Sequence, residues 1–71
     1  MEEESILLKF GRRVKELRLE RNLTQQQLAD ISGLHKNYIG MVERGERNPS
    51  LVNIDILAKS FNVETSVLMK F

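Results

Sequence analysis

Polar side chains that could recognise another molecule are concentrated between Lys36 and Arg44. A lysine can donate hydrogen bonds to O6 and N7 of guanine, and an asparagine can bond adenine through both ends of its amide. An arginine or a tyrosine can hold phosphate oxygens. On a helix, the outward positions of this stretch would be Lys36, Asn37, Gly40, Met41 and Arg44, with Tyr38 at the edge. This composition favours contact with DNA over an ordinary surface helix, which more often carries Glu and Lys pairs four residues apart.

Catalysis and metal binding have few candidate groups. The chain has one His and no Cys, so neither a disulfide framework nor a thiolate zinc site is expected. An enzyme needs titratable side chains that converge in a pocket, whereas the single imidazole, His35, lies at the start of a predicted helix. There it either caps the helix, the interpretation we favour, or contacts a base or a phosphate. We expect no enzyme activity, no metal, no cofactor and no small-molecule ligand.

Length and charge indicate a single small domain, residues 1–71, that needs a partner subunit for stability. The net charge is only +1, but the segment from Lys9 to Arg47 carries +4 and the residues outside it together carry −3. Such a distribution is suited to binding a polyanion, or it is simply a solvated surface rich in Arg.

No apolar run reaches the roughly 18 residues of a membrane span, and the acidic start, Met1 to Glu4, is unlike a signal peptide. We therefore expect a cytoplasmic protein with no membrane partner.

The spacing of apolar residues predicts an all-α, compact fold with five short helices, at about residues 5–21, 25–33, 36–44, 51–61 and 65–70. Thr24 and Gln27 have the spacing of a capping box, and Ser50 is a good N-cap. Residues that commonly end helices stand at the end of four segments or directly after it: Asn22, Gly33, Gly45 and Asn62. The positions expected to face the core are Leu7, Phe10, Val14, Leu17, Leu28, Ala29, Ile31, Ile39, Val42, Leu51, Ile54, Leu57, Ala58 and Phe61.

Apolar residues left over in the last third of the chain predict a dimer surface. The region is about 51–71, and the residues that the core does not need are Val52, Ile56, Leu68, Met69 and Phe71. An exposed apolar patch of this size in a small protein more often marks an interface than a wide core stripe.

The second and third predicted helices have the spacing of a helix-turn-helix. Ala29 is small enough for a close helix crossing, and Gly33 suits a turn with positive φ. Ile39 and Val42 would then pack the second helix of the motif onto the first. An ordinary helical hairpin is the alternative that this spacing alone leaves open.

A known family carries the same pattern. It is found in residues 24–45, TQQQLADISGLHKNYIGMVERG, and continues through Glu46-Arg47-Asn48-Pro49-Ser50. On these residues the chain resembles the lambda-repressor/Cro-like (XRE-type) helix-turn-helix family over about residues 6–68, nearly the whole chain. Within that family it is most similar to the small controller proteins of restriction–modification systems.

The resemblance implies a role for individual residues. Its base-reading positions are Lys36, Asn37, Met41 and Tyr38, and its phosphate-contacting positions are Gln25, Arg44, Arg47 and Asn48, with His35 as a further candidate. Arg18 and Glu43 match a buried ion pair of the family. Two residues depart from the common pattern: Met41 stands where many relatives carry a polar reader, and His35 replaces the usual Ser, Thr or Asp cap.

The function implied by the resemblance is sequence-specific transcription regulation by a homodimer on double-stranded DNA. A two-fold dimer would place two reading helices about 34–36 Å apart on a near-palindromic operator. A restriction–modification controller would regulate its own gene and the endonuclease gene, as repressor or activator, and activation would add RNA polymerase as a partner. The alternatives are a phage-type or antitoxin-like repressor, and a protein-interaction module that has lost DNA binding.

Overall fold

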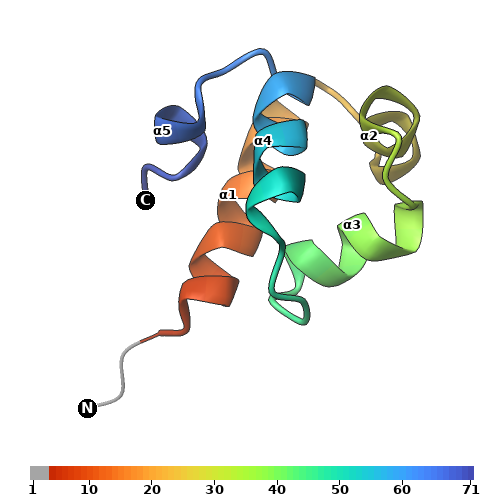
Figure 1. Ribbon diagram of the computed structural model, residues 1–71. Coiled ribbons are helices and arrows are strands. Elements are labelled where there is room, and N and C mark those ends of the chain that lie inside the picture. The colour runs from red at the N-terminus through yellow and green to blue at the C-terminus, as the bar shows by residue number, and fades with distance from the viewer. Residues whose placement is uncertain (1–3) are drawn as a thin grey trace.

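The computed structural model describes residues 4–71, and helices are the only regular elements in that range (Figure 1). Their bounds are as follows: α1 (Ile6–Glu20), α2 (Gln25–Ser32), α3 (Lys36–Glu43), α4 (Leu51–Ser60) and α5 (Thr65–Leu68). The predicted all-α class and the order of the helices are confirmed, with ends that differ by one or two residues. Most of the acidic start, Met1 to Glu3, lies outside the described residues. Among the described helices, none has the length and apolar character needed to cross a membrane.

Side-chain hydrogen bonds over two or three residues cap the starts of α1, α2, α3 and α4, whereas α5 begins without one. Thr24 and Gln27 form the predicted capping box: Thr24 Oγ1 accepts from the Gln27 backbone N–H at 3.0 Å, and Gln27 Oε1 accepts from the Thr24 N–H at 2.8 Å. Ser50 caps α4, because its side-chain oxygen accepts from the Asn53 backbone N–H. His35 is also a cap, because its Nδ1 accepts from the Asn37 backbone N–H at 3.1 Å. These bonds satisfy N–H groups that have no partner inside the helix.

Left-handed residues stop the chain from continuing as helix. Asn22 and Asn62 have φ angles of 55° and 57°, and Gly33 and Gly45 have φ angles of 75° and 74°. Asn and Gly adopt this conformation with the smallest steric cost, so each predicted stop is confirmed.

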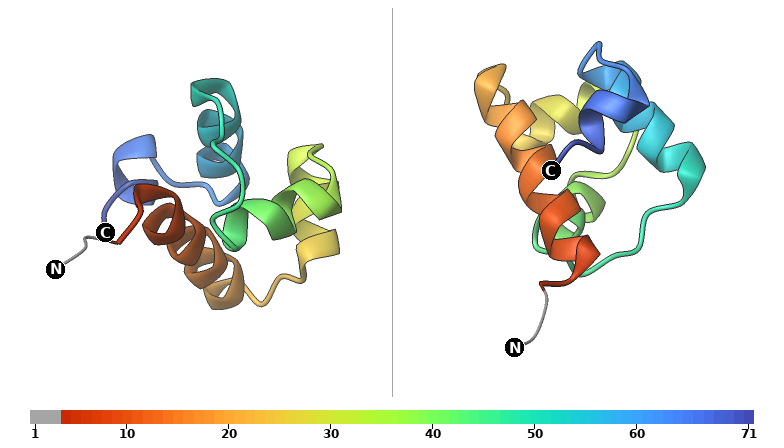
Figure 2. Two further views of the ribbon diagram at one scale, coloured as in Figure 1. Left: turned by 90° about the horizontal axis from the view of Figure 1, so that it is seen from below. Right: turned by 90° about the vertical axis from the view of Figure 1, so that its left-hand side faces the viewer.

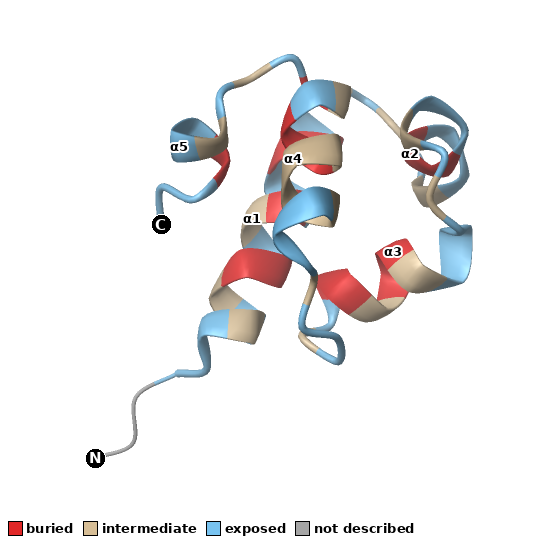
Figure 3. Cartoon of the chain, viewed as in Figure 1, coloured by how far each residue is buried: buried red, intermediate tan, exposed pale blue. Residues whose placement is uncertain are grey.

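The core is a single cluster to which every helix contributes. Its fully or nearly fully buried members are Phe10, Val14, Leu17, Leu28, Ala29, Ile39, Val42, Leu57, Ala58, Phe61 and Leu68. Figure 3 shows that the buried residues lie on the inner sides of the helices. The core therefore fixes the angle between α2, α3 and the rest of the molecule.

Two residues expected in the core are exposed. Ile31 is 55% exposed and Leu51 is 77% exposed. Ile31 lies at the end of α2, past the core contacts of Leu28 and Ala29, and lines a groove on the surface beside α4. Leu51 is the first residue of α4 and precedes the buried part of that helix. Both predictions were wrong because these helices are too short for their full apolar stripe to meet the core.

Leu68 was predicted to belong to the dimer surface, and this prediction was wrong. It is a core residue and is fully buried in the subunit. Nη2 of Arg13 on α1 donates to the Val67 carbonyl at 3.0 Å and ties α5 down. Leu68 then points into the core. A four-residue helix has too little periodicity for its buried face to be predicted from spacing.

The helices are arranged so that α2 and α3 lie on one side of the molecule and α5 on the other, as Figure 1 and the first view of Figure 2 show. Helix α3 packs against α1 and α2, α2 also packs against α4, and α4 against α5. Gly11 allows the close crossing of α1 and α3, since a Cβ there would lie 2.6 Å from the Glu43 carbonyl oxygen. This crossing brings the end of α3 against α1.

Candidate nucleic-acid interface

A short turn, Gly33 to His35, joins α2 to α3 and fixes their angle. The Gly33 N–H donates to the Ala29 carbonyl at 2.8 Å, and the Leu34 N–H donates to Ser32 Oγ at 3.1 Å. Leu34 packs against the core from within the turn. Nothing lies within 4 Å of a Cβ placed at Gly33, so its positive φ is the reason for a glycine there. The pair α2 and α3 is thus a rigid helix-turn-helix.

The outer face of α3 presents the side chains that the sequence singled out. Lys36 and Asn37 are exposed, and Tyr38 and Met41 are half-buried. Gly40, predicted to face outward, is buried. A Cβ there would meet Arg44 Nη1 at 3.1 Å, so a neighbouring side chain covers this position. The exposed polar surface of α3 is therefore narrower than predicted and lies mainly at the first turn of the helix.

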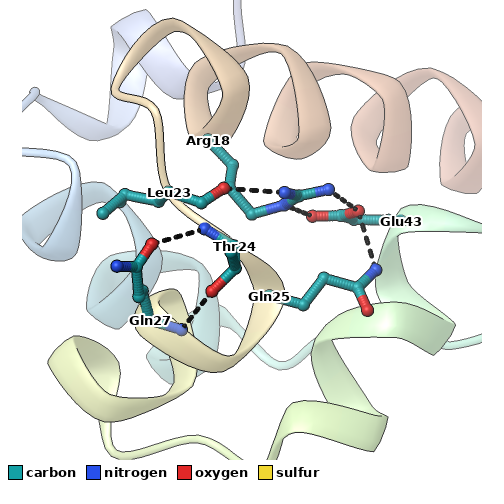
Figure 4. Close-up of polar contacts among 6 residues, drawn as sticks. All are labelled: Arg18, Leu23, Thr24, Gln25, Gln27 and Glu43. Carbon is teal, nitrogen blue, oxygen red and sulfur yellow. Dashed lines mark hydrogen bonds and ion pairs between the residues drawn. The ribbon is translucent and has the colours of Figure 1, made fainter.

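A buried ion pair holds the far end of α3. Arg18 on α1 donates from Nε to Glu43 Oε2 at 2.7 Å and from Nη2 to Glu43 Oε1 at 3.0 Å (Figure 4). Arg18 Nη1 also donates to the Leu23 carbonyl at 2.8 Å. The hydrogen bonds to Glu43 raise the pKa of the Arg18 guanidinium above its ordinary value. This is the ion pair that the resemblance implied, and it joins α1, the α1–α2 connection and α3.

Gln25, expected to hold a phosphate, takes part in the same network. Its Nε2 donates to Glu43 Oε1 at 3.1 Å, and its side chain is half-buried (Figure 4). The first turn of α2 is thereby connected to the last turn of α3. Sequence spacing gave no sign of this bond, because the two residues are 18 positions apart.

Arg44, another expected phosphate contact, has a partner inside the protein. Its Nε donates to Glu46 Oε2 at 2.9 Å and its Nη2 donates to Glu46 Oε1 at 3.3 Å, with both side chains more than half exposed. This hydrogen bonding raises the pKa of Arg44 and lowers the pKa of Glu46. A phosphate at Arg44 would compete with the Glu46 carboxylate. Opposite charges two residues apart in a loop were the signal that could have predicted this pair.

Tyr38 and Arg47 lie against each other at the edge of α3. The Arg47 guanidinium carbon is 5.4 Å from the centre of the Tyr38 ring, within range of a cation–π contact. The Tyr38 hydroxyl accepts a hydrogen bond from Asn53 Nδ2 of α4 at 3.0 Å. Asn48 is exposed one residue further along the loop. Sequence reasoning missed Asn53, because nothing in the order of residues connects it to Tyr38.

Apolar side chains of α4 and of the end of the chain are also accessible at the surface. Val52 is 68% exposed, Phe71 51% and Met69 37%, while Ile56 is half-buried. A groove of about 160 Å³ lies between the start of α1, the loop before α4 and the end of the chain. The residues that line it are Ile6, Leu7, Phe10, Asn48, Pro49, Ile54 and Met69. Four of the five predicted dimer residues therefore remain on the surface.

Comparison with known proteins matches residues 14–68 to a helix-turn-helix family, HTH_3. The chain is 52% identical over 56 residues to the control protein C.SmaI of Serratia marcescens, covering 79% of this chain and 67% of that protein. The crystal structure of the restriction–modification controller protein C.AhdI from Aeromonas hydrophila is 52% identical, has a TM-score of 0.85, and covers 87% of this chain and 94% of its own. The controller protein C.Esp1396I, solved as a tetramer with its natural 35 base-pair operator, is 33% identical with a TM-score of 0.84, and the match covers 93% of this chain and 87% of that one.

Proposed function

Because this chain belongs to the HTH_3 helix-turn-helix family of DNA-binding transcription regulators, which are not enzymes, we propose that it is a homodimeric controller of a restriction–modification system. It binds a near-palindromic operator in double-stranded DNA and regulates its own gene and the endonuclease gene in the cytoplasm. The observation that carries the proposal is the exposed donor pair, Lys36 and Asn37, at the first turn of a helix fixed by buried contacts. The similarity to C.SmaI and C.AhdI supports the restriction–modification role.

Side chains on the outer face of α3 read the bases. Lys36 donates to guanine, Asn37 bonds adenine, and Met41 contacts a thymine methyl group. Tyr38 lies at the border between base edges and the backbone. We assign these roles from side-chain chemistry and exposure.

Phosphate contacts surround the reading helix. Arg44, Arg47 and Asn48 follow α3, and Gln25 lies at the start of α2, where the helix dipole favours an anion. His35 remains a candidate, because a ring that accepts at Nδ1 carries its proton on Nε2 and can donate from there. Such contacts position a protein on DNA without selecting a sequence.

Dimerisation uses the apolar surface of residues 51–71, within a single domain of residues 1–71. Val52, Ile56, Met69 and Phe71 form it, and Leu51 adds exposed apolar area beside Val52. Burial of such a patch stabilises a small subunit. The dimer places two copies of α3 about one turn of B-DNA apart, roughly 34–36 Å. Where the dimer activates transcription, RNA polymerase is a further partner.

Selection of bound sequences from random duplex DNA tests this function, with purified protein at about 0.15 M salt, close to the physiological value. We expect a two-fold symmetric consensus with half-sites near one helical turn apart. The same consensus upstream of an endonuclease gene would support the controller role, whereas one upstream of phage or toxin genes would favour a phage-type or antitoxin-like repressor. Absence of any enriched sequence, with the protein folded and dimeric, would reject DNA reading in favour of a protein-interaction module.

A further inference from the structure

We propose that Asn53 of α4 is a positioning residue for DNA recognition, which holds the Tyr38 ring and, through that ring, the Arg47 side chain. This inference rests on the proposed function, since it assumes that α3 and the following loop meet DNA. It adds a residue outside the helix-turn-helix to the set that determines how the operator is read.

Tyr38 is fixed at both ends of its side chain. The ring is half-buried and packs against the core cluster, while the hydroxyl accepts from Asn53 Nδ2 at 3.0 Å. Asn53 is itself held in the first turn of α4, because its backbone N–H donates to Ser50 Oγ at 3.1 Å. A phenol ring bound at its hydroxyl cannot change rotamer without losing that hydrogen bond. Tyr38 is therefore a rigid feature of the surface.

The Tyr38 ring holds the Arg47 side chain in position. Arg47 lies in the loop between α3 and α4, where no helix fixes its direction. Its guanidinium carbon is 5.4 Å from the Tyr38 ring centre, and its Nη1 is 3.9 Å from Met41 Sδ. Stacking on an aromatic face leaves the N–H groups at the edge of the guanidinium free to bind phosphate. Loss of the ring's position would release Arg47 into solvent.

The Tyr38 hydroxyl oxygen is engaged by Asn53 inside the protein, and we assign its part in recognition to this bond and not to a direct contact with DNA. Tyr38 acts through its ring edge and as a platform for Arg47. Removal of the Tyr38 hydroxyl and removal of the Asn53 amide break the same hydrogen bond, so their effects on operator affinity must overlap. A direct contact between the hydroxyl and DNA would not produce this overlap.

The test is a double-mutant cycle of Tyr38→Phe and Asn53→Ala, measured as affinity for the selected operator and for a scrambled duplex of equal length. We expect each single variant to lose about 2- to 10-fold in operator affinity, the range of one net hydrogen bond. We expect the double variant to lose no more than either single variant. Affinity for the scrambled duplex should fall less than affinity for the operator, because a released Arg47 can still reach phosphate from the loop, whereas the Tyr38 ring edge no longer meets its base.

Two further variants separate positioning from a general effect on α4. Ser60→Ala removes a side-chain bond of the same helix, from Ser60 Oγ to the Ile56 carbonyl at 2.7 Å, and should bind both duplexes as wild type does. Asn53→Asp keeps the size of the side chain and accepts from the Tyr38 hydroxyl. Its added charge lowers affinity for both duplexes, but the ratio of operator to scrambled affinity should stay close to that of wild type.

A measurement without DNA tests the geometry itself. NMR of the free protein should show Arg47 side-chain protons shifted by the Tyr38 ring current, and this shift should be lost in Asn53→Ala while the core methyl signals remain. An unchanged Arg47 shift in Asn53→Ala would overturn the positioning role. So would a Tyr38→Phe effect on operator affinity that is as large in the Asn53→Ala background as in wild type. A wild-type protein with no preference for any duplex would instead reject the proposed function, and the positioning role would fall with it, even if the ring-current shift were present.

Discussion

Arg18, near the end of α1, and Glu43, the last residue of α3, share two hydrogen bonds of 2.7 and 3.0 Å in the interior of the protein. Both residues are less than one-tenth exposed. Glu43 also accepts from Gln25, so one carboxylate joins the two helices of the helix-turn-helix to α1. A charge removed from water at this position is tolerable only while its partner is present.

Loss of the Glu43 carboxylate should therefore destabilise the whole fold. In Glu43→Ala we expect the free energy of unfolding to fall by about 3–5 kcal/mol, because the Arg18 charge is left buried and unpaired. Urea unfolding followed by circular dichroism measures it. Lys59→Ala is the control: it breaks an exposed Lys59–Asp55 pair of 3.0 Å, which should contribute less than about 1 kcal/mol. Equal losses in the two variants would contradict a special role for burial.

Base-reading residues should affect specificity as well as affinity. Lys36→Ala and Asn37→Ala should each weaken operator binding by about 1–3 kcal/mol and relax the choice of base at one position of each half-site. Sequence selection repeated with each variant measures this. Arg44→Ala should instead weaken all duplexes alike and reduce the slope of log affinity against log salt by about 0.9 for each phosphate that the arginine no longer neutralises. A change in base preference in Arg44→Ala would show that the base-reading and phosphate-contacting roles are wrongly assigned.

Glu46 should restrain DNA binding by neutralising Arg44. The substitution Glu46→Gln frees the Arg44 guanidinium to bind phosphate. We therefore expect affinity to rise for operator and scrambled duplexes alike, by about 2- to 5-fold, which is the range of an exposed ion pair. Fluorescence anisotropy at two salt concentrations measures this, and the gain should shrink at the higher one.

The control for Glu46 is Glu64→Gln, which changes the net charge equally but lies at the N-cap of α5. It should leave both affinities nearly unchanged. A gain equal to that of Glu46→Gln would mean that total charge, and not the Arg44 contact, sets the affinity.

The dimer surface should be sensitive to charge at Val52. Because its side chain is 68% exposed in the subunit, Val52→Glu should leave the fold intact while it places charge in the apolar contact. We expect monomers by sedimentation at concentrations where wild type is dimeric, together with loss of operator binding. Leu19→Glu is the matched control, because Leu19 is 54% exposed on α1, outside the proposed dimer surface; this variant should remain dimeric. A dimeric Val52→Glu variant would place the interface elsewhere.

The sequence by itself determined the helices and their ends, because the signals are local. The Thr24–Gln27 capping box, the His35 cap and the stops at Asn22 and Gly33 act over two to four residues, so their spacing in the chain is also their spacing in space. Three of the four core-facing residues expected in α1, Phe10, Val14 and Leu17, followed from periodicity, since a 15-residue helix repeats its apolar face several times, whereas Leu7 is only half-buried.

Only the tertiary structure decided contacts between distant residues and the faces of the shorter helices. Tyr38 and Asn53 are 15 positions apart, and their hydrogen bond exists because α3 and α4 pack on one core. Leu51, expected in the core, is exposed because it begins α4 ahead of the buried part of that helix, and Leu68, expected on the surface, is buried because the single turn of α5 fits more than one orientation. Side-chain spacing limits which faces a helix can bury, but the neighbouring helices select the one that is buried.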